Sequence, residues 1–371
     1  MSRGSRQRLC QEIERQEIRL AQRKNLFRIF PFIGIVLIAV GAVAAPAPAF
    51  KQPETLKEIL ALSPAELENC DIARMNLICA ERLPGAESLS VDNSLVALDS
   101  WAQHIKSEAD RNFHRFQESP AYYYNSTNFY KMLMMAVVLY EDYNIRYNPK
   151  WISPPGSERP DDHFFADASD ILIPGLVSSR RMGTCSSMPI LYIALGRRLG
   201  YPLKLVKSKE HLFMRWDSPT EQFDMDATGK GLDKRDDEFY KKWPFPLTAQ
   251  AIHDEDYLKS LSTCEELSVF LTIRGACFTE AGRLAEATTS FKDAYLRAPN
   301  WKGNQIMLVA AEQRSMPHYL PLDSHVSREQ QALDAVPQPQ GMDTGTPKIP
   351  DPDPLKQLQI QNPTMNPIPN P

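Results

Sequence analysis

Three residues near the middle of the chain have the side chains needed for thiol chemistry. Cys185 follows a Gly-Thr pair and precedes an apolar stretch, His211 lies 26 residues later, and Asp226 lies 15 residues beyond His211. In acyl transfer a thiolate attacks a carbonyl carbon, an imidazole handles the proton, and a carboxylate holds the imidazole in the required tautomer. The order of residue types therefore predicts Cys185 as nucleophile, His211 as base and Asp226 as the orienting acid.

The residues around Cys185 favour an anionic sulfur. Residues 190–200 are largely apolar and end in a glycine, which predicts a helix that starts just after Cys185. Free N–H groups and the dipole at a helix start stabilise a thiolate, and the N–H of Cys185 is a candidate oxyanion donor. Pro189 fits only a first helical turn, so a helix that begins at residues 186–188, with Cys185 on the preceding turn, also fits the sequence. A buried apolar thiol without a catalytic role is the alternative interpretation.

Two further aspartates compete with Asp226 for the third role. Alternating polarity and β-branched or aromatic content predict three short strands, at residues 201–209, 211–217 and 221–229. Asp224 and Asp226 then share one face of a strand, because successive side chains alternate between faces. Either carboxylate is placed to orient His211, and Asp217 is a weaker third choice.

The elements on either side of the site are expected to be mostly helical. Apolar residues recur at three- and four-residue spacings in residues 95–116 and 128–143, as in helices that bury one face. A crossing rich in proline and aspartate, residues 151–170, lies before Cys185, and loops of this length often border a site. A helix that leads into an antiparallel sheet is an α+β arrangement.

A different pattern begins at residue 266. Residues 266–300 predict a helix, a turn and a second helix. The segment resembles a tetratricopeptide repeat in the spacing of Gly275, Phe278, Gly282, Ala287, Phe291, Ala294 and Pro299. Leu271 and Arg274 occupy two outer consensus positions, so the match is incomplete. One repeat cannot bury its own apolar face, so it must pack on the preceding region, on residues 301–313, or on a protein partner.

The stretch around the three candidate residues also resembles a known family. The sequences are GTCSSMPILYIALGRRLGYPLKLVKSKEHLFMRWD (residues 183–217) and FDMDATGKG (residues 223–231). They are similar to the transglutaminase-like superfamily, and more closely to its bacterial SirB1-like branch. The resemblance covers about residues 147–231, and a helical repeat behind such a core is similar to the SirB1-like arrangement.

This resemblance implies a transglutaminase-like core in which a helix that starts at the nucleophile packs on a small antiparallel sheet. Cys185 matches the nucleophile, His211 the base and Asp226 the third member of the triad. The expected activity is hydrolysis or acyl transfer at a peptide or amide bond of a protein or peptide substrate, with water or an amine as the acceptor. The alternative is a non-catalytic binding protein that keeps the fold as a scaffold and recruits partners through the repeat.

The composition argues against two other classes of protein. With 42 Lys and Arg against 46 Asp and Glu, and a net charge of −4, the chain has no positive excess for binding a nucleic-acid backbone. Its six cysteines form no C-x-x-C pair and its seven histidines form no H-E-x-x-H motif, so the usual zinc spacings are absent. We therefore expect no nucleic-acid partner, no metal site and no cofactor.

The first fifty residues predict a targeting segment. Residues 1–28 form a basic leader with a net charge of +5, and residues 29–50 carry no charge. The most apolar part, residues 29–45, would span about 26 Å as a helix, against about 30 Å for a bilayer core. An uncleaved membrane anchor and a signal peptide cleaved after Ala44 both fit this pattern. Either one predicts a membrane-anchored or exported protein, periplasmic or otherwise extracytoplasmic.

Together these patterns predict the organisation of the whole chain. The expected regions are a basic leader (1–28), a signal peptide or membrane anchor (29–50), a helical region (51–150), a transglutaminase-like core (151–250), a helical segment similar to a tetratricopeptide repeat (251–315) and a disordered Pro-rich tail (316–371). The fold class is α+β. The candidate site belongs to the fourth of these regions.

Overall fold

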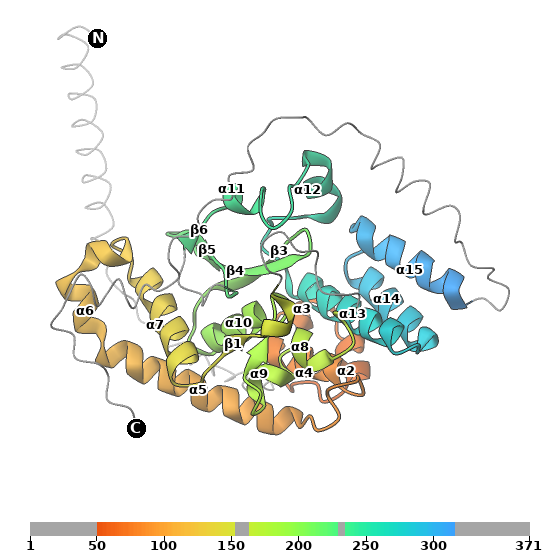
Figure 1. Ribbon diagram of the computed structural model, residues 1–371, viewed down its shortest axis with the longest axis horizontal. Coiled ribbons are helices and arrows are strands. Elements are labelled where there is room, and N and C mark those ends of the chain that lie inside the picture. The colour runs from red at the N-terminus through yellow and green to blue at the C-terminus, as the bar shows by residue number, and fades with distance from the viewer. Residues whose placement is uncertain (1–49, 153–162, 229–233, 316–371) are drawn as a thin grey trace, which may run out of the picture. The chain divides into compact units, whose positions relative to one another are not determined.

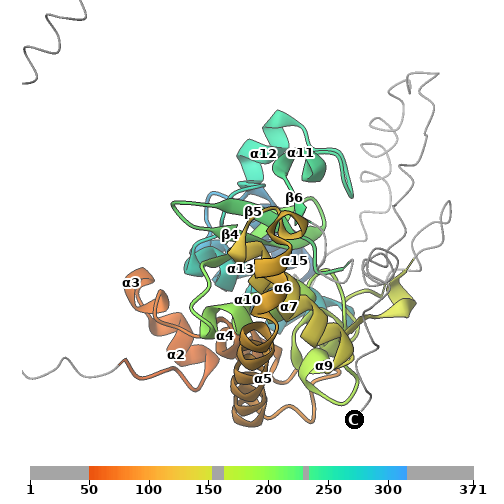
Figure 2. The same ribbon diagram turned by 90° about the vertical axis from the view of Figure 1, so that its left-hand side faces the viewer.

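The computed structural model describes residues 50–152, 163–228 and 234–315, which combine helices with two small sheets (Figures 1 and 2). The larger sheet is antiparallel and follows chain order: β3 (Leu203–Ser208), β4 (His211–Asp217), β5 (Gln222–Met225) and β6 (Lys234–Arg235). The smaller sheet is a parallel pair of β1 (Arg146–Tyr147) and β2 (Met182–Gly183). The expected α+β class is confirmed at this level.

Helices precede, interrupt and follow these strands. Before β1 lie α2 (Leu56–Ala61), α3 (Pro64–Leu67), α4 (Ile72–Ala80), α5 (Val91–Arg111), α6 (Phe113–Glu118), the 3-10 turn η1 (Pro120–Tyr123) and α7 (Thr127–Glu141). Between β1 and β3 lie the 3-10 turn η2 (Pro149–Trp151), α8 (Ala168–Ile171), α9 (Pro174–Val177) and α10 (Met188–Arg198). After the sheet follow α11 (Asp237–Tyr240), α12 (Ala249–Glu255), α13 (Thr263–Glu280), α14 (Leu284–Arg297) and α15 (Lys302–Ser315).

The long helix expected over residues 95–116 is divided in two. Helix α5 ends at Arg111, and Asn112 donates its side-chain amide to the carbonyl of Glu108 at 2.9 Å. This bond satisfies a carbonyl at the end of the helix, and α6 starts directly afterwards. Asparagine favours such ends because its side chain competes with the backbone for hydrogen bonds.

The antiparallel sheet separates two layers. Leu212, Met214 and Trp216 of β4 face the main helical core, where α10 packs against β3 and β4. Phe213 points to the other face and forms a smaller apolar cluster with Tyr240 of α11. Both views place α10 and α5 on one side of the sheet and α11 and α12 on the other (Figures 1 and 2). Because side chains alternate along a strand, His211 lies on the same face as Phe213.

Apart from the smaller cluster around Phe213, one hydrophobic core joins helices from both ends of the described chain. The cluster of buried apolar side chains extends from Ile59 in α2 to Ala311 in α15. Arg274 of α13 ties the two ends together, because it donates to the carbonyls of Cys79 and Glu81 at 2.6 and 2.7 Å. The helices before and after the sheet therefore share their packing with the site region.

The last three helices form an antiparallel arrangement. Helices α13 and α14 pack closely because Gly275 has no side chain, and a Cβ there would lie 2.6 Å from the ring of Phe291. Asn304 of α15 donates to the hydroxyl of Ser268 in α13 at 2.8 Å. The apolar face of this segment is thus covered by α4 and α15, which are two of the partners that the sequence allowed.

The expectation of a transmembrane anchor needs correction. Among the residues that the structure describes, no helix combines the length and the apolar character needed to span a bilayer. That expectation relied on residues 29–50, all but the last of which lie outside the described ranges, as do the basic leader and the Pro-rich tail. The apolar run is only 17 residues long, so its length was already marginal for spanning. We do not retain the membrane assignment.

Candidate active site

Cys185 lies on the turn between β2 and α10. Helix α10 begins at Met188, and the N–H groups of Ser187 and Met188 donate to the carbonyl of Thr184 at 3.2 and 3.0 Å. The regular helix therefore starts three residues after Cys185, as the position of Pro189 in the first turn permits. The helix dipole contributes less to the sulfur than it would if Cys185 were the first helical residue.

The turn that carries Cys185 is fixed by a backbone carbonyl. Thr184 Oγ1 and Ser187 Oγ both donate to the carbonyl of Asp170, at 3.0 and 2.9 Å, and Ser187 Oγ accepts from the N–H of Thr184 at 3.0 Å. These three residues are all buried. Gly183 belongs to the same packing, since a Cβ there would lie 2.6 Å from Ser187 Oγ. The turn that carries the sulfur is thus held both by contacts within it and by the carbonyl of Asp170 in α8.

The carboxylate of Asp170 holds the residues next to this turn. It accepts hydrogen bonds from Asn148 Nδ2 at 2.8 Å, Trp151 Nε1 at 2.9 Å and Arg180 Nη2 at 2.5 Å. The N–H of Asn148 in turn donates to the carbonyl of Gly183 at 2.8 Å. Sequence reasoning missed Asp170, because it lies in a crossing without periodicity and its partners are distant along the chain.

His211 opens β4, and its ring is held by Asp226, the residue directly after β5. The distance from His211 Nε2 to Asp226 Oδ2 is 2.7 Å, and the two side chains are 3% and 9% exposed. Asp226 Oδ1 accepts from the N–H of Thr228 at 2.8 Å and from its hydroxyl, and Tyr240 donates to Oδ2 at 3.3 Å. Because Asp226 occupies Nε2, the nitrogen left for Cys185 is Nδ1.

Electrostatic contacts make the ring of His211 a strong base. Burial alone lowers its pKa, but hydrogen bonds with Asp226 and Cys185, together with their charges, raise the pKa of His211 from 6.5 to about 9. Burial alone raises the pKa of Asp226, but the hydrogen bonds from His211 and Thr228 outweigh it and lower the pKa. At neutral pH the ring is therefore an imidazolium next to the sulfur. Such a cation favours the thiolate form of a cysteine.

The other two candidate aspartates are engaged elsewhere. Asp224 accepts two hydrogen bonds from Arg215, at 2.6 Å from Nε and 3.1 Å from Nη2. Asp217 accepts from the side-chain amide of its cross-strand neighbour at 2.8 Å, at the far end of β4. Of the three carboxylates that the sequence left open, Asp226 is the one that reaches His211.

Aromatic side chains cover the His211–Asp226 pair on the face of the sheet that carries Phe213 and α11. Tyr240 stacks on Phe213 with ring centroids 3.6 Å apart, and Trp243 meets the ring of His211 edge-on at 4.7 Å. This cover excludes water from Asp226 and strengthens its interaction with His211. The sequence did not point to these aromatic residues, because they follow the strands in a segment that has no motif.

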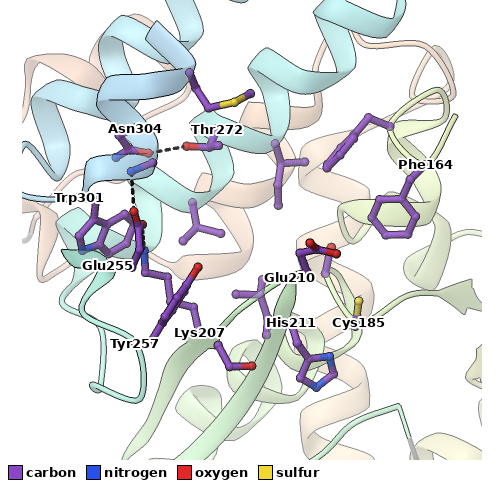
Figure 3. Close-up of a pocket in the computed structure, with 18 of the residues that line it drawn as sticks. Phe164, Cys185, Lys207, Glu210, His211, Glu255, Tyr257, Thr272, Trp301 and Asn304 are labelled. Carbon is purple, nitrogen blue, oxygen red and sulfur yellow. Dashed lines mark hydrogen bonds and ion pairs between the residues drawn. The ribbon is translucent and has the colours of Figure 1, made fainter. Parts of the chain in front are cut away.

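Cys185 and His211 line a cavity of about 650 Å³ (Figure 3). Next to Cys185 the wall is aromatic, formed by Phe164 and by Trp151, whose rings meet edge-on with centroids 5.0 Å apart. Thr272 of α13 and its neighbours on α15 line the other end. The helical segment after the sheet therefore borders the cavity directly. A volume of this size is in the range of ligand-binding pockets.

The backbone N–H of Cys185 is a candidate oxyanion donor. In the described part of the chain the N–H of Cys185 donates to no acceptor, whereas the N–H of Ser186 donates to Thr184 Oγ1 at 3.3 Å. A free N–H on the nucleophile itself is a common oxyanion donor in acyl transfer. Cys185 and His211 thus lie at one end of the cavity, with Asp226 hydrogen-bonded to the far nitrogen of the His211 ring.

Comparisons of the chain with protein-family models, with curated proteins and with solved structures found no match. Within the described ranges, no group of three or more His, Cys, Asp and Glu side chains is arranged to hold a metal ion. A function has to be inferred from the arrangement of Cys185, His211 and Asp226 and from the cavity that they border.

Proposed function

We propose that this protein is a transglutaminase-like thiol enzyme that hydrolyses or transfers acyl groups at peptide or amide bonds. One observation carries the proposal: Cys185 lies in a cavity next to His211, and the far nitrogen of that ring is 2.7 Å from the buried carboxylate of Asp226. Buried, coupled titratable groups cluster at catalytic sites, and here the pair also lies beside a cysteine in a cavity.

In the first half of the proposed reaction, the thiolate of Cys185 attacks the carbonyl carbon of the substrate. The carbonyl electrons move to the oxygen, and the N–H of Cys185 stabilises the resulting oxyanion. When the C–N bond breaks, the imidazolium of His211 gives its proton from Nδ1 to the leaving amine. The acyl group remains on sulfur as a thioester, and His211 is now neutral.

In the second half, neutral His211 takes a proton from the incoming nucleophile. Water attack releases a carboxylic acid, and amine attack forms a new amide; in both cases the thiolate of Cys185 leaves and His211 returns to the imidazolium. Asp226 keeps the ring oriented and stabilises its positive charge throughout. The segment from α13 to α15, which resembles a tetratricopeptide repeat, borders the cavity, so we assign it to binding of a protein or peptide substrate.

Alkylation with iodoacetamide at neutral pH tests the activated thiol, with peptide mass spectrometry to identify the labelled residue. Cys264 is an internal reference, because it is also partly exposed and burial raises its pKa. We expect Cys185 to be labelled first, and His211→Ala to remove this advantage. His104→Ala is the matched control, since His104 makes the same 2.7 Å contact with a carboxylate, that of Asp142, on the surface.

A negative result would favour a different class of function. If Cys185 reacts no faster than Cys264 and His211→Ala changes nothing, the fold is better explained as a non-catalytic scaffold that binds a partner. A positive result leads to the substrate, through comparison of the peptides released or joined in protein mixtures by the wild type and by Cys185→Ala. Products formed only by the wild type then distinguish hydrolysis from transfer.

A further inference from the structure

The cavity extends from Cys185 to a second group of side chains that the proposed reaction does not use. This group, the lysine end of the cavity, consists of Lys207 on β3, Glu255 at the end of α12, Tyr257, and Trp301 just before α15. Figure 3 shows it on the side of the cavity opposite to Cys185. A substrate that reaches across the cavity would contact both ends.

Lys207 is an unusually buried cation. The residue is 9% exposed, and its Nζ lies 3.4 Å from the ring centroid of Trp301 and 5.2 Å from that of Tyr257. Within the described residues it forms an ion pair with Glu255, at 3.2 Å. Burial lowers the pKa of Lys207 to about 8, and the contact with Glu255 together with the charges of Asp256 and Glu265 offsets this only in part.

Glu255 is shared between two donors. One of its oxygens accepts from Lys207, and the other accepts from the N–H of Gly303 in the first turn of α15 at 2.6 Å. The contact with Lys207 is longer than the roughly 2.7–2.9 Å of a strong charge-assisted bond. Glu255 thus binds the helix start closely and the lysine more weakly.

Lys207 keeps hydrogen-bond donors that its contact with Glu255 does not use. An ammonium has three N–H donors, and one of those on Lys207 is directed at Glu255. The face of the Trp301 ring, and not its buried indole N–H, is what Lys207 contacts. The hydroxyl of Tyr257 adds a further group able to donate. A buried donor without an acceptor costs free energy, so this end of the cavity favours a ligand rich in acceptors.

We propose that the lysine end is a subsite for a carboxylate of the substrate, bound by Lys207 with the hydroxyl of Tyr257. This inference rests on the proposed function, because it assigns an acidic peptide as the substrate class of the same cavity. The carboxylate belongs either to a Glu or Asp side chain or to the C-terminus of the peptide. A carboxylate is acceptor-only and suits the N–H donors of Lys207 that Glu255 does not take.

A cationic ligand is disfavoured by the same contacts. Aromatic faces next to a carboxylate normally attract ammonium groups. Here the ammonium of Lys207 already lies over the ring of Trp301 and next to Glu255. A second cation would be repelled by Lys207 and would find the ring face already covered. The protein's own lysine thus occupies the ring face that a cationic ligand would use, while Glu210 adds a second carboxylate to the cavity wall.

The first test measures binding without catalysis. In full-length Cys185→Ala labelled with ¹³C-lysine, the Cε resonance that titrates near pH 8 reports on Lys207, and its loss in Lys207→Met confirms the assignment. We expect glutarate to raise this pKa towards its ordinary 10.5 and the neutral analogue glutaramide to leave it unchanged. An equal effect of the two compounds, or none from either, would overturn the subsite.

The second test measures selectivity with three pools of N-acetylated pentapeptides. One carries Glu and a C-terminal amide, the second Gln and a C-terminal amide, and the third Gln and a free C-terminal carboxylate. We expect the wild type to prefer one acidic pool over the amidated Gln pool by about tenfold or more, which also identifies the source of the carboxylate. Lys207→Met should reduce this ratio to about one, and Lys209→Met, which removes an exposed neighbouring charge, should keep it.

The two proposals fail in different ways. If the wild type cleaves all three pools equally, the carboxylate subsite is wrong and the thiol enzyme stands. If no pool is processed by the wild type beyond the level of Cys185→Ala, the enzyme proposal loses support, and the glutarate titration still decides whether Lys207 binds a carboxylate.

Discussion

Arg215 on β4 and Asp224 on β5 face each other in the strand register and are joined by two hydrogen bonds, of 2.6 and 3.1 Å. Asp224 shares its strand face with Asp226, so the two carboxylates lie close to the same histidine-bearing strand. Because the guanidinium of Arg215 binds Asp224 at both oxygens, the two acids have different roles. One stabilises the sheet, and the other is left to His211.

This division of roles predicts that the same substitution at the two aspartates affects different properties: activity at Asp226 and stability at Asp224. Asp226→Asn should slow turnover by about 100- to 10,000-fold, because an amide no longer favours the imidazolium or fixes the tautomer of His211. It should also slow alkylation of Cys185 at neutral pH. Turnover rates and alkylation rates of the purified variant, measured under identical conditions, check both outcomes.

Asp224→Asn is the matched control. It should cost about 1.5–3 kcal/mol of unfolding free energy, because Arg215 is 5% exposed and loses a charged partner. Alkylation of Cys185 in the folded variant should stay close to the wild-type rate. A control variant that loses reactivity as severely as Asp226→Asn would contradict the assignment of Asp226 as the orienting acid.

The pair His211–Asp226 should also make stability depend on pH. The pKa of His211 is raised from 6.5 to about 9, so its stabilising contribution is complete below pH 6.5 and is lost as the pH rises through 9. The pKa of Asp226 is lowered from 3.8, so its contribution is present above pH 3.8 and is lost at lower pH. The pair therefore stabilises the fold most between pH 3.8 and 6.5.

Urea unfolding of the wild type and His211→Gln at several pH values tests this dependence. The difference in unfolding free energy should be roughly 3 kcal/mol near pH 6 and should shrink towards pH 9.5. His104→Gln removes an exposed pair and should cost less than about 1 kcal/mol at every pH. If the loss of unfolding free energy in His211→Gln grows with pH, His211 is not held as an imidazolium in the folded protein.

The sequence was informative where the signal is local. Strand alternation predicted β3, β4 and β5, and with them the meeting of His211 and Asp226 on neighbouring strands. Strand alternation could not choose between Asp224 and Asp226 as the partner of His211, because a period of two places both side chains on one face of the strand. The register across the β4–β5 turn pairs Asp217 with Gln222, and therefore Arg215 with Asp224. This pairing of opposite charges favours Asp226 over Asp224 as the partner of His211.

Other features depend on contacts that no spacing encodes. Asp170 meets Ser187 and Trp151 through hydrogen bonds across a crossing without periodicity. Lys207 and Glu255 come from a strand and a helix that are 48 residues apart, and they meet only because the chain folds back over the sheet. Such groups become visible when burial and partners are known, since each residue alone is an ordinary surface type.

The turn that carries Cys185 can be tested through one buried hydroxyl. Ser187→Ala removes the bond to the carbonyl of Asp170 at 2.9 Å and the acceptor for the N–H of Thr184. We expect a loss of about 1–3 kcal/mol in unfolding free energy and slower alkylation of Cys185, because two buried backbone groups lose a partner next to the sulfur.

Ser268→Ala is a close control for this variant. Ser268 is equally buried, donates to the carbonyl of Ala294 at 2.8 Å and accepts from Asn304 at 2.8 Å, but it lies within α13. It should lose similar stability without a change in the reactivity of Cys185. Equal alkylation rates in the two variants would show that the Asp170 contacts do not position the nucleophile.

The packing of α13 on α14 predicts a steric effect that a second substitution relieves. A Cβ at Gly275 would lie 2.6–2.8 Å from ring atoms of Phe291, so Gly275→Ala should cost about 1–3 kcal/mol of unfolding free energy. Phe291→Leu in the same chain should recover part of this loss, because it shortens the obstructing side chain. Gly282→Ala has no atom within 4 Å of the added carbon, and its φ of +70° alone should cost about 1 kcal/mol. Denaturant unfolding of the wild type, Gly275→Ala, Phe291→Leu, their double variant and Gly282→Ala measures these differences, and a strictly additive double variant would mean that Gly275 is not required by the ring of Phe291.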